Sequence, residues 1–122
     1  MPSNYQIELK SWLRKLDLLQ QENVLLKTRV AEILQNDVDR PTVDKLENYL
    51  FGFIQKDAIL ALLRRDVANE MKSAGFYQKG EAHDVIEKKQ GGLRKDIAQM
   101  EFEFYKLKMD FSNYLVQLTH AA

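Results

Sequence analysis

Residues 46–71 read LENYLFGFIQKDAILALLRRDVANEM. Positions separated by alternating steps of four and three are mostly apolar, which is the spacing of a heptad row that faces partner helices. We call such positions the inner row, and here they are Leu46, Leu50, Phe53, Asp57, Leu60, Arg64, Val67 and Met71. Ile54 and Ala61 lie beside this row, and we expect them to widen it into the broader stripe of a helix bundle.

The same stretch has a second apolar strip on the opposite side of the helix. Its members are Phe51, Ala58, Ile59 and Leu62. A helix that is apolar on both sides usually lies between other elements, because each apolar face needs a cover. We therefore expect residues 42–74 to form the middle helix, with the segments before and after it packed on its sides.

The segment from residue 3 to about residue 36 is expected to form the first helix. Its inner row keeps the four-three spacing throughout: Tyr5, Leu9, Trp12, Leu16, Leu19, Asn23, Leu26, Val30 and Ile33. Leu13 and Leu34 sit beside this row, at positions that a simple parallel dimer would fill with charges. This pattern favours a bundle in which the helix has more than one neighbour. Trp12 should be buried between the first and second helices.

The connections are short. Residues 36–41, NDVDRP, predict a turn, because Asn and Asp side chains compete for the backbone and Pro lacks an amide hydrogen. Thr42 is expected to cap the second helix. Residues 75–80, GFYQKG, predict the second turn, and the third helix should span residues 81–119.

The third helix has its own inner row. Two glycines lie beside this row, but its four-three spacing is unbroken. Its members are Ile86, Gln90, Leu93, Ile97, Met100, Phe104, Leu107, Phe111, Tyr114 and Leu118. Each glycine inside a helix costs about 0.5–1 kcal/mol relative to alanine, so a break at Gly91–Gly92 is one alternative. The unbroken spacing from Ile86 to Leu93 favours a continuous helix.

These elements predict an all-α fold, with residues 1–122 forming a single helical-bundle domain. Short connections make neighbouring helices antiparallel, and at about 1.5 Å per residue each helix is roughly 50 Å long. We therefore expect an elongated, coiled-coil-like bundle of three long antiparallel helices. This arrangement, which includes a tryptophan in the first helix, resembles a spectrin-type triple-helical repeat. The likeness is one of architecture and extends to no sequence motif.

Antiparallel alignment about the two turns predicts which polar inner-row residues face each other. Asn23 then faces Asp57, and Arg64 lies close to Gln90. We interpret these pairs as two structural polar layers that fix the alignment, since a single polar residue on such a row can set register at a cost in stability. A ligand or ion site inside the bundle is the alternative. One charged group per layer, beside a neutral amide, is a poor ligand set for a metal ion.

The composition argues against several classes of function. Lys and Arg number 18, and so do Asp and Glu, so the net charge is zero, which argues against nucleic acid and anionic membrane surfaces as partners. The absence of cysteine excludes disulfides, thiolate catalysis and cysteine-ligated zinc. No apolar run approaches the length of a membrane span, and the first ten residues lack the apolar core of a signal peptide. A cytoplasmic protein is expected.

No motif typical of catalysis or of cofactor binding occurs, so we expect neither an enzyme nor a cofactor or metal site. Residues 88–95, KKQGGLRK, hold four cations: Lys88, Lys89, Arg94 and Lys95. Without a preceding strand this is no phosphate-binding loop. Contact with nucleic-acid phosphates is one alternative function, and a ligand- or metal-binding bundle is another, but a solvated helix face fits the zero net charge better.

The apolar residues outside the inner rows are the residues that say most about function. The candidate interface consists of Phe102, Tyr105, Met109 and Val116 on the third helix, and Phe51, Ile59 and Leu62 on the second. Contiguous exposed apolar patches mark partner surfaces. We therefore predict a non-catalytic interaction or scaffolding module that acts as a homo-oligomer. Its simplest form is a dimer in which two third helices pair about a two-fold axis; another protein is the alternative partner.

Overall fold

The computed structural model describes residues 4–74 and 83–121, with the backbone alone for Ala74, His83 and Ala121. Three helices account for nearly all of them: α1 (Asn4–Leu34), α2 (Arg40–Ala74) and α3 (His83–Ala121). The predicted all-α class and the three helices are confirmed, and the described residues contain no strand. The turn predicted at 75–80 and the start predicted at 81 lie outside the described residues.

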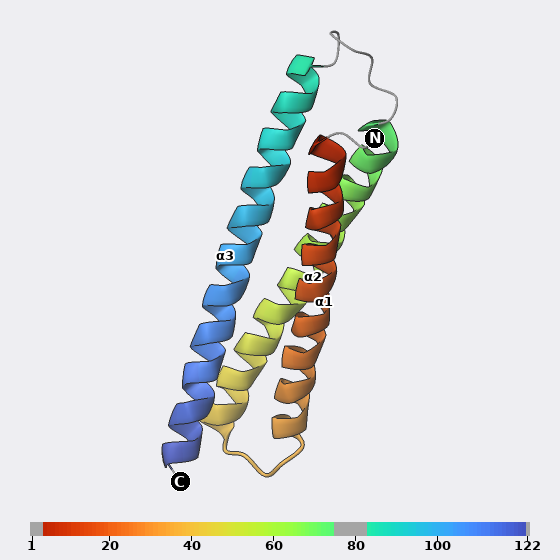
Figure 1. Ribbon diagram of the computed structural model, residues 1–122. Coiled ribbons are helices and arrows are strands. Elements are labelled where there is room, and N and C mark those ends of the chain that lie inside the picture. The colour runs from red at the N-terminus through yellow and green to blue at the C-terminus, as the bar shows by residue number, and fades with distance from the viewer. Residues whose placement is uncertain (1–3, 75–82, 122) are drawn as a thin grey trace.

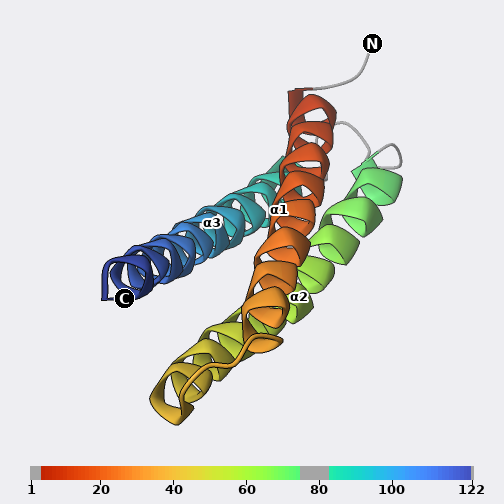
Figure 2. The same cartoon turned by 90° about the horizontal axis from the view of Figure 1, so that it is seen from below.

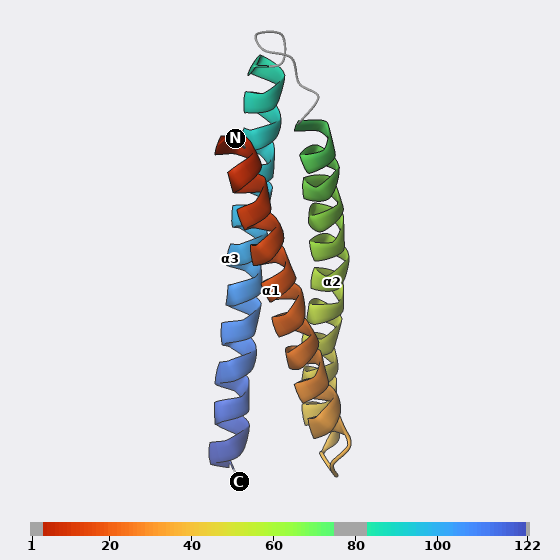
Figure 3. The same ribbon diagram turned by 45° about the vertical axis from the view of Figure 1, so that its right-hand side comes forward.

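The helices lie side by side along one long axis. In Figure 1, α1 descends from the amino terminus, α2 climbs back beside it, and α3 descends to the carboxyl terminus. The same elongated shape is seen after a 45° turn in Figure 3. The view from below in Figure 2 shows α1 and α2 lying together, with α3 inclined to them.

The cap of α2 differs from the prediction. The Thr42 amide donates a hydrogen bond to Asp39 Oδ1 at 3.2 Å, and the Val43 amide donates to the Asp39 carbonyl at 3.0 Å. Asp39, and not Thr42, is therefore the N-cap residue. Pro41 falls in the first turn, where its missing amide hydrogen leaves no helical bond unmade. The hydrogen bonds from Thr42 hold the pKa of Asp39 below its ordinary value.

Helix α3 is continuous through Gly91 and Gly92, as the spacing of its inner row predicts. A Cβ atom added at either glycine would meet no atom of the described residues within 4 Å. Packing against the described part of the chain therefore requires neither glycine. Gly52 in α2 is different, because a Cβ atom there would lie 3.2 Å from Leu107 Cδ2. The missing side chain at Gly52 lets α3 approach α2 closely.

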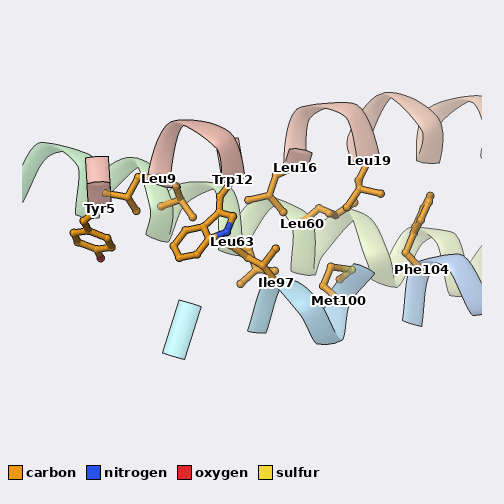
Figure 4. Packing of buried hydrophobic residues seen from close by; sticks show 11 residues of the cluster. Tyr5, Leu9, Trp12, Leu16, Leu19, Leu60, Leu63, Ile97, Met100 and Phe104 are labelled. Carbon is orange, nitrogen blue, oxygen red and sulfur yellow. The ribbon is translucent and has the colours of Figure 1, made fainter. Parts of the chain in front are cut away.

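The core has two parts along the long axis. The larger part consists of Tyr5, Leu9, Trp12, Leu16, Leu19, Leu60, Leu63, Val67, Ile97, Met100 and Phe104. The smaller part consists of Val30, Leu46, Phe53 and Phe111. Trp12 is 7% exposed, and Figure 4 shows its indole in the larger part near Leu63 and Ile97. The predicted burial of Trp12 is confirmed.

The buried stripe of α2 widens on the side opposite to the predicted one. Ile54 is 50% exposed and Ala61 is also exposed, whereas Leu63 and Glu70 are buried. The reason is the position of α3, which packs along the side of α2 that carries Leu63 and Glu70. Because α2 is apolar on both sides, the sequence pattern alone does not identify which side α3 covers.

The alignment of α2 with α3 is shifted from the predicted one. The predicted alignment, extended along the helices, places Lys56 opposite Gln99. Instead, Lys56 Nζ lies 3.3 Å from Glu103 Oε2, which is about one helical turn further along α3. Hydrogen bonds from Gln99 and then Lys56 keep the pKa of Glu103 below its ordinary value. A shift of one turn keeps the inner rows facing each other, so heptad spacing alone does not exclude it.

Candidate interaction surface

A polar layer separates the two parts of the core. Asn23 is fully buried, and its Nδ2 donates hydrogen bonds to the Phe53 carbonyl at 2.9 Å and to Asp57 Oδ1 at 2.5 Å. Lys27 Nζ donates to the other oxygen of Asp57. The predicted contact between Asn23 and Asp57 is confirmed. Asn23 Oδ1 is buried and has no hydrogen-bond partner among the described residues, and such an unsatisfied group costs about 1–3 kcal/mol.

The second predicted layer, Arg64 with Gln90, does not form. Arg64 Nε donates to Asp17 Oδ1 at 2.6 Å, and Gln90 Nε2 donates to Glu8 Oε1 at 2.7 Å. Arg64 is exposed because its long side chain carries the guanidinium out of the apolar interior to a carboxylate on α1. Both residues therefore contact α1 instead of each other.

Helices α1 and α3 are joined by a charge ladder that sequence reasoning missed. Its pairs are Glu8 with Arg94, Lys15 with Glu101, and Glu22 with Lys108. The first two pairs are 2.9 and 3.4 Å apart. The members recur every seven residues on both helices, with alternating sign. This recurrence was visible in the sequence, but it has meaning only once α1 and α3 are known to be neighbours.

The basic stretch 88–95 is partly used inside the chain. Lys89 Nζ lies 3.5 Å from Glu70 Oε2, and Arg94 pairs with Glu8. Two of its four cations thus face carboxylates of α1 and α2, and Lys88 and Lys95 remain exposed on α3. This arrangement weakens the case for a phosphate-binding surface here.

The Tyr49 side chain of α2 packs against two aromatic side chains of α3. Its ring centroid lies 5.3 Å from that of Phe111 and 5.6 Å from that of Tyr114, and its hydroxyl donates to the Asp110 carbonyl at 3.2 Å. Burial, and then the charge of Asp110, raise the pKa of Tyr49. The hydroxyl is protonated at neutral pH and acts as a structural hydrogen-bond donor.

Within residues 4–74 and 83–121, no three His, Cys, Asp or Glu side chains are grouped so as to hold a metal ion. The side chain of His83 lies outside the described atoms, and His120 is exposed. The hollows are open surface grooves, such as the one of about 310 Å³ between α2 and α3 that Ile59 and Leu62 help to line.

The outer face of α2 carries no charge in its middle part, between residues 48 and 62. This face consists of Asn48, Phe51, Ile54, Gln55, Ala58, Ile59, Ala61 and Leu62, all exposed. Phe51 is 62% exposed and Leu62 is 49% exposed. Between Asn48 and Leu63 the charged residues are Lys56 and Asp57, which pair with α3 and α1. In a chain that is 30% charged, such a face is unusual.

Between Lys88 and Val116 the outer face of α3 is apolar at its centre and otherwise basic or neutral, and the exposed Asp84 lies one heptad before Gly91. It consists of Lys88, Gly91, Gly92, Lys95, Ala98, Gln99, Phe102, Tyr105, Lys106, Met109, Ser112, Asn113 and Val116, all exposed. Phe102 is 65% exposed and Met109 is 59% exposed. None of these residues is acidic. The predicted interface residues on α2 and α3 are thus all accessible in the single chain.

The fold and these surfaces define an all-α bundle of three helices with two exposed apolar faces. None of the described helices combines the length and the apolarity that a membrane crossing requires. Comparison with protein-family models, with curated proteins and with solved structures finds no match to this chain.

Proposed function

We propose that this chain is a non-catalytic interaction or scaffolding module: an antiparallel, coiled-coil-like bundle of three helices that self-associates and holds other proteins. The observation that carries this proposal is the outer face of α2. Its apolar side chains are exposed, while the neighbouring charges of Lys56 and Asp57 are used inside the bundle. Burial of apolar surface stabilises association by about 25 cal/mol per Å².

The polar groups support the same proposal. The buried layer of Asn23 and Asp57 is held by contacts between α1 and α2, and the charge ladder is held by contacts between α1 and α3. Both arrangements align helices, which is the established use of polar residues on heptad rows.

Light scattering tests self-association directly. We expect the parent protein to run as a dimer at high micromolar concentration, with the helix content unchanged between dilute and concentrated samples. A monomer at the highest soluble concentration would refute the homo-oligomer.

The scaffolding role needs a separate experiment. The parent and a Phe102→Lys/Met109→Lys variant, which changes only exposed positions of α3, would be compared as bait in an extract of the native host. A protein that is retained by the parent and lost from the variant supports the role. If both baits retain the same proteins, the outer face of α3 is not the binding surface.

A further inference from the structure

One row on the outside of α2 has charges of opposite sign at its two ends. At intervals of seven residues, this outer row reads Asp44, Phe51, Ala58, Arg65 and Lys72, and all five side chains are exposed. The row is acidic at its start, apolar in the middle and basic at its end. Lys45 and Asp66 lie to one side of it, and Lys45 Nζ is 5.5 Å from the centroid of the Tyr49 ring.

We propose that this row binds the same row of a second copy of the chain, with the two α2 helices antiparallel and the two-fold axis at Ala58. The inference rests on the proposed self-association and assigns its interface. In this alignment Asp44 lies opposite Lys72 of the second copy. Phe51 lies opposite Arg65, a cation over an aromatic face. Ala58 lies opposite Ala58, where the small side chain lets the helices approach closely.

The charges select the antiparallel orientation. A parallel pairing would place Arg65 opposite Arg65 and Lys72 opposite Lys72, and such like-charge contacts oppose binding. Asp44 is also 3.3 Å from Arg40 within its own helix, but both side chains are largely exposed. That exposure leaves the second oxygen of Asp44 accessible to Lys72 of the other chain.

The neighbouring row has complementary sizes. It reads Glu47, Ile54, Ala61 and Ala68 at intervals of seven. In the antiparallel alignment Ile54 lies opposite Ala61 of the second copy, so a large side chain meets a small one. Glu47 falls between Arg65 and Lys72 of the second copy, which adds a second attractive contact at each end of the interface.

The outer face of α3 lacks this reciprocity. From Lys88 to Val116 its charges are those of Lys88, Lys95 and Lys106, and the acidic residue Asp84, in line with this face, lies in the first turn of α3, away from the apolar centre. A partner with acidic side chains fits that face better than the chain itself does. The structure therefore favours α2 over α3 as the surface for self-association.

Charge reversal provides a specific test. Asp44→Lys places two lysines opposite each other at both ends of the dimer, and Lys72→Asp places two carboxylates there. Each variant alone should dimerise more weakly, by roughly 2- to 30-fold for two exposed pairs. Mixing the two variants restores attraction at both ends, so they should form a mixed dimer of parental strength. If mixing restores nothing, the antiparallel alignment is overturned.

Cysteine cross-linking locates the axis, because the parent chain has no cysteine. Under mild oxidation Ala58→Cys should form a disulfide-linked dimer, since its two copies meet at the axis. Ala98→Cys, an exposed alanine on α3, is the matched control and should remain reduced. Equal cross-linking of both variants would mean random collision and would overturn the assignment.

A third pair of variants separates this inference from the proposed function. Ala58→Arg should raise the dissociation constant of the dimer at least about tenfold, because it puts bulk and like charges at the axis. Met109→Lys on α3 should leave the dimer intact. A parent dimer that survives Ala58→Arg but is lost in Met109→Lys would move the interface to α3 while self-association stands. A monomeric parent would refute both proposals.

Discussion

Replacement of Asn23 by leucine should not destabilise the protein, although it removes a fully buried polar side chain with two hydrogen bonds. The substitution removes the unpaired Oδ1, which costs about 1–3 kcal/mol. It also buries a leucine, which gains about 1.5–3 kcal/mol.

The losses are smaller because the former partners stay satisfied. The Phe53 carbonyl lies within α2 and can accept a helical hydrogen bond, and its lost bond is worth about 0.5–1.5 kcal/mol. Asp57 keeps Lys27 as its partner, and its side chain is 36% exposed, so water reaches it. Its lost bond from Asn23 is worth about 1.5–3 kcal/mol. The free energy of unfolding of the Asn23→Leu variant should therefore equal that of the parent or exceed it by up to about 1–2 kcal/mol.

Urea unfolding at one protein concentration, followed by circular dichroism and by Trp12 fluorescence, measures this balance. Asn23→Ala is the control, because it removes the same hydrogen bonds and leaves a cavity; it should lose about 2–3 kcal/mol. A loss above about 1 kcal/mol in Asn23→Leu, with an unchanged dependence on urea, would refute the reasoning. It would mean that the polar layer contributes stability and not only alignment.

Three further predictions concern the helices. Gly91→Ala and Gly92→Ala should each stabilise the protein by about 0.5–1 kcal/mol, since a Cβ atom there meets no atom of the described residues; a lower thermal midpoint would contradict this. Trp12→Ala should cost about 3–5 kcal/mol, as truncation of a large buried side chain does, and a parent emission maximum typical of indole in water would argue against the burial seen here. The pKa of Asp39 is lower in the folded state than its ordinary value of 3.8. The ionised Asp39 cap therefore stabilises the folded protein above pH 3.8, and this stabilisation is lost as the pH falls through the folded pKa. Asp39→Ala should therefore unfold at a lower urea concentration than the parent at pH 7, and this difference in urea midpoint should shrink in acid. Asp39→Asn also provides a capping side chain and should resemble the parent at neutral pH.

How much the sequence predicts depends on which helices are compared. The contact of Asn23 with Asp57 follows from the short connection between α1 and α2, which leaves little freedom in their alignment. The alignment of α2 with α3 does not follow, because a shift of one turn keeps both inner rows facing each other. Lys56 therefore meets Glu103 instead of the expected Gln99.

Other differences have a chemical origin. Asp39 and Thr42 are both good capping residues, so composition does not choose between them. Arg64 is long enough to leave the interior, and its contact with Asp17 is decided by what lies nearby on α1. The exposure of Ile54 and the burial of Leu63 depend on the side of α2 that α3 covers. The candidate surface could be predicted from the sequence because apolar residues outside the inner rows recur at heptad spacing. That Asp44 of one copy can face Lys72 of another could not be predicted before the exposed side of α2 was known.

The alternating signs of the charge ladder disfavour a shifted alignment of α3 along α1. A slide of α3 by seven residues along α1, roughly 10 Å, would bring matching inner rows together again. The same slide would place Glu8 beside Glu101 and Lys15 beside Lys108, so both charge pairs that remain in the slid alignment are repulsive. Reversing the middle pair alone, with Lys15→Glu and Glu101→Lys, would keep all contacts attractive and make the slid alignment attractive too. The order of the signs, and not the number of pairs, therefore distinguishes the native alignment from its nearest competitor.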